Sequence, residues 1–192
     1  MRSDSTMDMA DLSEVDKIVA ATRTWLERAV IGLNLCPFAR PVHLHHRIRY
    51  FVSAAQSQQQ LLEDLMAELH GLDMADPEQC ETTLLIHPHV LADFADYNDF
   101  LGSADDAVAE LGLEGVIQVA SFHPRYQFEE AGPDDIENYT NRSPYPMLHL
   151  LRETSVERAV TSHPDTTTIY KKNIDTLRRL GHDGWRRLWL DE

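Results

Sequence analysis

Apolar positions recur with helical period over the first part of the chain. From Ser13 their spacing predicts one long helix, with Asp16 three residues further on as the second half of a capping box. Pro37 disfavours helical geometry at Cys36, so we expect this helix to end near Leu35. Cys36 would then lie where the chain leaves the helix.

Three short segments have the pattern of strands. Residues 47–54 alternate apolar and polar side chains, residues 82–86 are a β-branched and leucine run, and residues 116–122 form a third such segment. Helical spacing follows Ser57, and Ser103 has the position of a cap for another helix. Connections this long favour parallel pairing through helical crossovers.

The pattern changes after the third strand. Residues 127–146 are loop-like, and helical spacing returns in three segments, at 147–160, 167–180 and 184–190. Gly181 has the position of a helix C-terminal cap.

These elements predict an α/β fold with a small, three-stranded, parallel sheet in the order β-α-β-α-β. A long N-terminal helix and a C-terminal group of helices would pack against the sheet. A chain of 192 residues fits one compact domain, so we expect residues 1–192 to form a single domain, with residues 1–12 disordered.

The net charge of −15 argues against nucleic acid and anionic membranes as partners. No apolar run approaches the ~20 residues that span a bilayer. Two cysteines and an acidic, polar N-terminus predict a cytoplasmic protein. The basic residues near the C-terminus alternate with acidic ones at helical spacing, and a solvated helix face is favoured over an anion-binding surface; they are Lys171, Lys172, Arg178, Arg179, Arg186 and Arg187.

Two expected strands end in histidine. His87 follows one strand and His123 another, so parallel strands would bring both side chains to the same edge of the sheet, where ligands collect in open sheets. A structural role and a functional role are both consistent with such a pair.

The stretch from Ser121 to Glu153 is the most chemically loaded part of the chain. If residues 147–160 are helical, His149 and Glu153 lie four residues apart on one face. An intrahelical hydrogen-bonded pair and a metal site both fit this spacing.

Four long motifs resemble a widespread family of proteins with a domain of unknown function, found in bacteria and plastid-bearing lineages. They are residues 34–39 (NLCPFA), 96–101 (DYNDFL), 121–128 (SFHPxYxF) and 141–153 (NRSPYPMLHLLRE). The resemblance covers nearly the whole chain and implies no activity, but it ranks the polar residues. The motif positions include Asn34, Cys36, Tyr97, Asn98, His123, Tyr126, Asn138, Asn141, Arg142, His149, Arg152 and Glu153.

This ranked set allows three hypotheses, of which an enzyme is favoured. In the first, Cys36, His123, His149 and Glu153 bind a transition metal ion, zinc, copper or iron, in an oxidoreductase or metal-assisted hydrolase. In the second, Arg142 and Arg152 hold a small carboxylate or phosphate in a metal-free enzyme or binding protein. In the third, the network is structural and the chain is an interaction module.

The site residues follow from these hypotheses. Catalysis is assigned to His123, Tyr126, Arg142 and Arg152, cofactor or ligand contacts to Asn34, Tyr97, Asn98 and Asn141, and metal ligation to Cys36, His123, His149 and Glu153. The partner expected is a small polar or anionic molecule.

Overall fold

The computed structural model of the chain describes residues 13–162 and 166–190, so the disorder expected for residues 1–12 lies outside the described residues. Its elements, in chain order, are α1 (Glu14–Trp25), the π-helical segment η2 (Leu26–Ile31), α2 (Ala39–Leu44), β1 (Ile48–Val52), α3 (Gln58–Met74), β2 (Thr82–Ile86), α4 (Phe94–Glu110), β3 (Ile117–Phe122), the 3-10 helix η3 (Ile136–Thr140), β4 (Met147–Arg152), α5 (Glu153–Ser162) and α6 (Thr166–Arg187).

The sheet has four strands in the order β1, β2, β4, β3. β1 and β2 pair in parallel, whereas β4 pairs antiparallel with both β2 and β3. The expectation of a three-stranded parallel sheet is therefore wrong: the sheet is mixed, and a fourth strand separates β2 from β3. The α/β class and the parallel pairing of β1 with β2 around α3 are confirmed.

The fourth strand comes from a segment whose spacing predicted a helix. Residues 147–152 form β4, and α5 begins only at Glu153. Five of the six β4 residues are buried, because the strand is paired on both edges and covered on both faces. A short run that is apolar on both faces lacks alternation, so its periodicity cannot distinguish a central strand from a buried helix.

The helix before β3 begins nine residues earlier than Ser103, at Phe94. Its N-cap is Asp93, whose carboxylate accepts a hydrogen bond from the Ala95 N–H at 2.9 Å. The cap assigned to Ser103 was therefore wrong. The correction places Tyr97 on the first turns of α4, facing the sheet.

The expectations for both ends of the described chain are largely confirmed. Ser13 and Asp16 form the capping box of α1, and the helix continues through η2, whose C-cap is Gly32. The short helix α2 was not predicted. Near the other end, Gly181 interrupts α6 with a φ of 64°, a conformation that glycine adopts without steric cost. In the described part of the chain, no helix combines the length and apolar character needed to cross a membrane.

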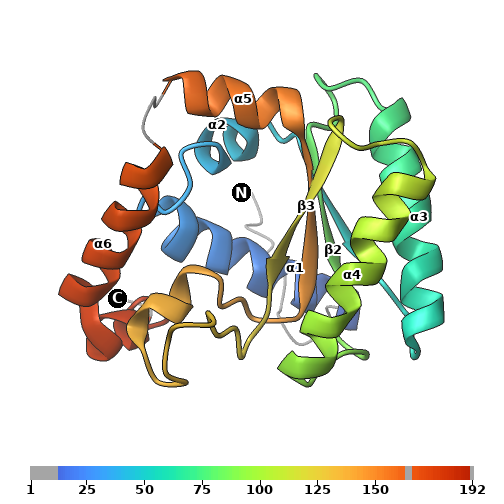
Figure 1. Cartoon of the computed structure of the whole chain (residues 1–192). Helices are drawn as coiled ribbons and strands as arrows, with labels where there is room; N and C mark the ends of the chain where they lie inside the picture. Colours follow the sequence, from blue (N-terminus) through green and yellow to red (C-terminus); the bar gives the residue numbers. More distant parts are fainter. Residues whose placement is uncertain (1–12, 163–165, 191–192) are drawn as a thin grey trace, which may run out of the picture.

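Helices cover both faces of the sheet (Figure 1). α3 and α4 pack on one face, where Leu65 and Leu85 are completely buried. α1, η2 and α6 lie on the opposite face, where Trp25, Leu177 and Met147 belong to a second core cluster. Side chains that alternate along β3 and β4 therefore enter two different environments.

Tyr97 connects α4 to both of these strands. Its hydroxyl donates to the backbone oxygen of Met147 on β4 at 2.8 Å and accepts from the Phe122 N–H on β3 at 3.0 Å. The side chain is completely buried, and burial raises the pKa of the hydroxyl, which keeps it protonated. The hydroxyl thus bonds backbone groups where the ladder between β3 and β4 ends.

A Tyr97→Phe substitution tests the contribution of this hydroxyl. It removes two buried hydrogen bonds, and we expect the free energy of unfolding in urea to fall by about 2 to 3 kcal/mol. Tyr126→Phe is the matched control, because the one hydrogen bond of the Tyr126 hydroxyl to the described residues is a 3.4 Å contact with Ser121 Oγ. We expect the control to lose less than about 1 kcal/mol. Equal losses in the two variants would contradict this interpretation.

Candidate functional site

The histidines that follow β2 and β3 lie at the same edge of the sheet. Both strands run antiparallel to β4, so they share one direction. His87 and His123 both contact the ring of Tyr97, with centroid distances of 5.8 and 5.0 Å. The predicted convergence of the two histidines is confirmed, although β4 separates the strands that precede them.

His123 is completely buried against α4, and both of its ring nitrogens are engaged. Nδ1 accepts from the Arg125 N–H at 3.0 Å, so Nε2 carries the hydrogen and donates to the Leu91 oxygen at 3.1 Å. Burial lowers the pKa of the ring, which favours this neutral form. With both nitrogens bonded, His123 offers no lone pair to a metal ion and no position for a substrate proton. The geometry instead joins β3 to the loop before α4.

The two ring nitrogens of His87 differ. Nδ1 donates to the Val90 oxygen at 3.0 Å, whereas Nε2 is buried and has no hydrogen-bond partner within the part of the chain that the structure describes. Burial lowers the pKa of this ring to about 4. His87 is therefore a neutral histidine in the core beside Tyr97.

Cys36 and His149 lie on the opposite face of the sheet, where they line one small apolar cavity of about 50 Å³. The Thr82 hydroxyl donates to the Leu150 oxygen at 2.6 Å, so the 2.7 Å contact with His149 is a bond from the Nε2–H to Thr82 Oγ1. Burial lowers the pKa of His149 to about 4 and raises the pKa of the Cys36 thiol. Both side chains are neutral in this environment.

The structure does not bring the four expected metal ligands together. His123 faces α4, whereas Cys36 and His149 share the cavity on the other side of the sheet. Glu153 begins α5, and its N–H donates to the Val116 oxygen at 2.9 Å. Among residues 13–162 and 166–190, no three His, Cys, Asp or Glu side chains are grouped as metal ligands.

Arg152 lies at the far end of β4, away from Arg142. Its Nη2 donates to the backbone oxygens of Leu72 and, at 2.7 Å, of Ala75. These carbonyls belong to the C-terminal end of α3, where the last carbonyls of a helix lack intrahelical partners. Buried in this position, Arg152 caps α3 and is not available to clamp an anion with Arg142.

The asparagines that the sequence motifs singled out do not lie together in the structure. Asn141 donates to the Ser121 oxygen at 3.1 Å, and the completely buried Asn138 binds the Phe128 N–H and the Gly132 oxygen, so both fasten the loop before β4. Asn98 is exposed on α4. Asn34 is exposed in the turn after η2, with a φ of 55°.

Arg142 and Tyr126 meet where this loop returns to the sheet. The Arg142 Nε donates to the Tyr126 oxygen at 3.1 Å, and Nη2 donates to the Pro133 oxygen at 2.6 Å. The guanidinium carbon lies 4.4 Å from the centre of the Tyr139 ring. The Tyr126 ring packs instead toward Phe94 and Phe128. Arg142 is thus held on three sides, and its Nη1 has no hydrogen-bond partner among the described residues.

Arg142 lines a cavity of about 570 Å³ between α1, the loop after η3 and the end of α6. We name it the arginine–tryptophan cavity; its lining residues are Ala21, Thr24, Trp25, Arg28, Pro124, Tyr139, Arg142, Ser143, Pro144, Trp185 and Trp189. Its volume lies within the range of small-molecule sites. Figure 1 shows α1, α6 and the η3 segment together on the side of the sheet opposite α3 and α4.

Long-range hydrogen bonds hold the walls of the cavity in place. The Trp25 Nε1–H donates to the Arg142 backbone oxygen at 2.9 Å, and the Arg28 Nη1 donates to the Leu188 oxygen at 2.9 Å. Trp185 contacts both Tyr139 and Trp189 edge to face, with centroid distances of 5.0 and 5.5 Å. The first three of these contacts join segments that are far apart in the chain. The contact between Trp185 and Trp189 joins α6 to the residues that follow it.

The lining combines aromatic surface with positive charge. Two arginines line the cavity, and none of its described lining residues carries a carboxylate. In a chain with 32 acidic and 17 basic residues, this local balance is the reverse of the whole. Aromatic surface and arginine side chains therefore meet in one cavity.

Arg142 was predicted from the sequence as a site residue, but the other residues that line this cavity were not. The chain has three tryptophans, and all three, Trp25, Trp185 and Trp189, line it. Trp185 and Trp189 are four residues apart, a spacing that places two aromatic rings on one face of a helical segment. That spacing was a signal in the sequence, but the pairing with Trp25 depends on how α6 packs.

Comparison with known proteins identifies one family. A family model described as "Protein of unknown function (DUF1415)" matches residues 17–187. No curated protein and no solved structure matches the chain.

The lowered pKa values of His87 and His149 predict that acid destabilises the fold. The loss begins at pH values well above those at which carboxylates usually titrate. An unfolded histidine takes up its proton near pH 6.5, whereas folded His87 and His149 do so only near pH 4. The stability that these two neutral histidines contribute is therefore fully present above pH 6.5, and it is lost as the pH falls from 6.5 toward 4. His87 alone should remove about 1.4 kcal/mol per pH unit in this window.

Urea denaturation at several pH values between 7 and 4.5 measures this loss. We expect His87→Asn and His149→Asn each to flatten the pH dependence, because each removes one titrating group, even where the variant is less stable at pH 7. A slope that is unchanged in both variants would assign the acid sensitivity to other groups.

Proposed function

We propose that this chain, which belongs to the DUF1415 family of proteins of unknown function, binds a small organic anion with a planar apolar body in the arginine–tryptophan cavity. The proposal refines the hypothesis of a carboxylate or phosphate ligand at Arg142. Arg152 is no longer part of it, because that guanidinium caps α3.

Arg142 is the anchor for the anionic group. Its Nε and Nη2 are bonded to backbone oxygens and its face lies on Tyr139, so the guanidinium loses little freedom when a ligand arrives. Backbone carbonyls do not neutralise its charge. The remaining Nη1–H groups are suited to a charge-assisted hydrogen bond with a carboxylate.

The indole rings provide the surface for the rest of the ligand. Trp25 is buried and hydrogen-bonded, so its ring forms a rigid wall of the cavity. Trp189 is 38% exposed, so one side of the aromatic cluster is open to an incoming molecule. Aromatic walls bind planar groups through stacking and removal of apolar surface from water.

One observation carries the proposal: Arg142, whose guanidinium is fixed on three sides, lines an aromatic cavity whose described lining includes no carboxylate. The lining groups are suited to holding and orienting a ligand. Thr24 and Ser143 add hydroxyls, although Ser143 Oγ already donates to the Tyr145 oxygen at 2.7 Å.

Tryptophan fluorescence tests this directly, because every tryptophan of the chain lines the cavity. Benzoate is the probe, and benzamide is its uncharged counterpart of nearly the same shape. We expect a saturable fluorescence change with benzoate and binding of benzamide that is weaker by about tenfold or more, as for loss of one charge-assisted hydrogen bond.

Two variants separate the contributions of charge and ring. Arg142→Gln should remove the preference for benzoate over benzamide, and Trp189→Ala should weaken both probes while preserving the preference. Circular dichroism checks that each variant is folded. Equal binding of the two probes by the parent chain, or an undiminished preference in folded Arg142→Gln, would refute the proposal.

A further inference from the structure

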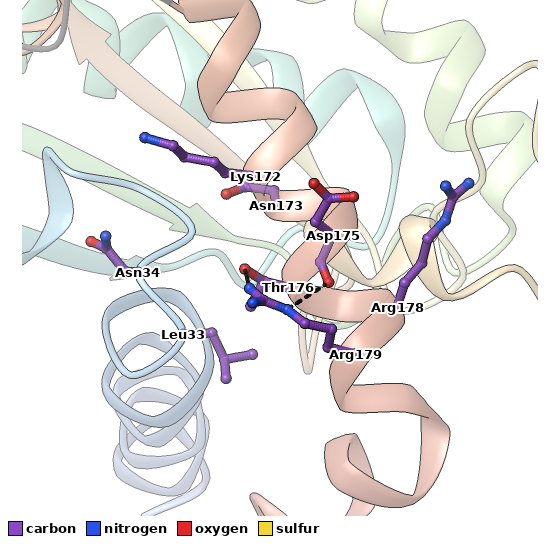
Figure 2. Close-up of a pocket in the computed structure, with 8 residues that line it drawn as sticks. All are labelled: Leu33, Asn34, Lys172, Asn173, Asp175, Thr176, Arg178 and Arg179. Atoms are coloured by element: carbon purple, nitrogen blue, oxygen red, sulfur yellow. Dashed lines mark hydrogen bonds between the residues drawn. The ribbon is translucent and has the colours of Figure 1, made fainter.

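A second hollow lies on the same side of the sheet, between the Leu33–Asn34 turn and residues 172–179 of α6 (Figure 2). We name it the basic groove; its volume is about 740 Å³. It shares no lining residue with the arginine–tryptophan cavity, so an assignment here does not depend on the proposed function.

The two walls of the basic groove are fixed relative to each other. Asn173, a buried residue of α6, donates from Nδ2 to the Leu35 backbone oxygen at 2.8 Å. The Leu35 N–H in turn bonds to the Val30 oxygen of η2 at 2.8 Å. Leu177 fixes the same stretch of α6 in the core, where it is completely buried. The groove is therefore formed before any ligand binds.

Two cations point into this space without a carboxylate partner among the described residues. Figure 2 shows Lys172 and Arg179 on the side of α6 that faces the turn, with Arg178 pointing away. Arg178 is paired with Glu137. The Arg179 guanidinium is held by the Asp175 backbone oxygen, 3.2 Å from Nε, and by Thr176 Oγ1, 3.4 Å from Nη2. These neutral contacts orient the guanidinium and leave its charge uncompensated.

The lining offers positive charge and hydrogen-bond donors to a small anion. Lys172 and Arg179 supply two positive charges, and the Asn34 amide and the Thr176 hydroxyl can donate further hydrogen bonds. Asp175 is the one carboxylate among the described lining residues. The net charge of −15 disfavours a long polyanion, which leaves a small anion as the ligand. Lysine and arginine together with neutral donors are typical of phosphate sites.

We propose that the basic groove binds the phosphate group of a small, soluble phosphomonoester. Lys172 and Arg179 neutralise the dianion, and Thr176 and Asn34 complete its hydrogen bonds. The sequence pattern favoured a solvated helix face for these basic residues. The proposal instead assigns Lys172 and Arg179 to a ligand site, whereas Arg178 pairs with Glu137.

Isothermal titration calorimetry of the full chain with inorganic phosphate tests the site, with sodium chloride added to hold the ionic strength constant. We expect saturable binding with one site per chain. Lys172→Gln and Arg179→Gln should each weaken it by about tenfold or more. Lys171→Gln is the matched control: it removes the same charge from the neighbouring exposed residue, which lies outside the lining, and should change the affinity by less than about twofold.

Three results would overturn the proposal. The first is the absence of saturable phosphate binding by the parent chain. The second is an equal loss in Lys171→Gln and Lys172→Gln, which would indicate attraction to the general charge of α6. The third is binding of phosphatidic acid vesicles in a sedimentation assay without binding of inorganic phosphate, which would assign the groove to a membrane surface.

Discussion

The insertion of β4 between β2 and β3 is the constraint on which the rest of the structure depends. It pairs antiparallel with both neighbours, so β2 and β3 share a direction without touching. This brings His87 and His123 to one edge, where Tyr97 contacts both. The alternation of side chains along β4 also directs His149 toward α1 and Arg152 toward α3, which separates residues that are close in sequence.

The histidines of the chain illustrate how burial decides between structure and chemistry. His123 has both nitrogens bonded to backbone groups, and His149 donates to Thr82. Each is kept neutral by the low polarity around it, as is His87. Both proposed sites are built instead from arginine and lysine on the side of the sheet that α1 and α6 cover.

The sequence predicted the elements whose pattern is local. The capping box at Ser13 follows from side chains three residues apart, and the break at Gly181 follows from a conformation that other residues avoid. The first three strands were also placed correctly, and Arg142 was selected as a site residue. The sequence did not reveal β4, because a doubly covered strand has no alternating pattern, and the spacing of His149 and Glu153 then suggested a helical pair that does not exist.

By itself, the sequence determined an α/β chain of the DUF1415 family with a concentration of arginine, asparagine and aromatic residues around the loop before residue 147. Only the tertiary structure decided which of these side chains meet. Trp25 reaches Arg142, Arg28 reaches Leu188 and Asn173 reaches Leu35 across long separations in the chain. Such contacts depend on how whole helices pack against a sheet, and neither the spacing nor the type of the residues involved specifies that packing.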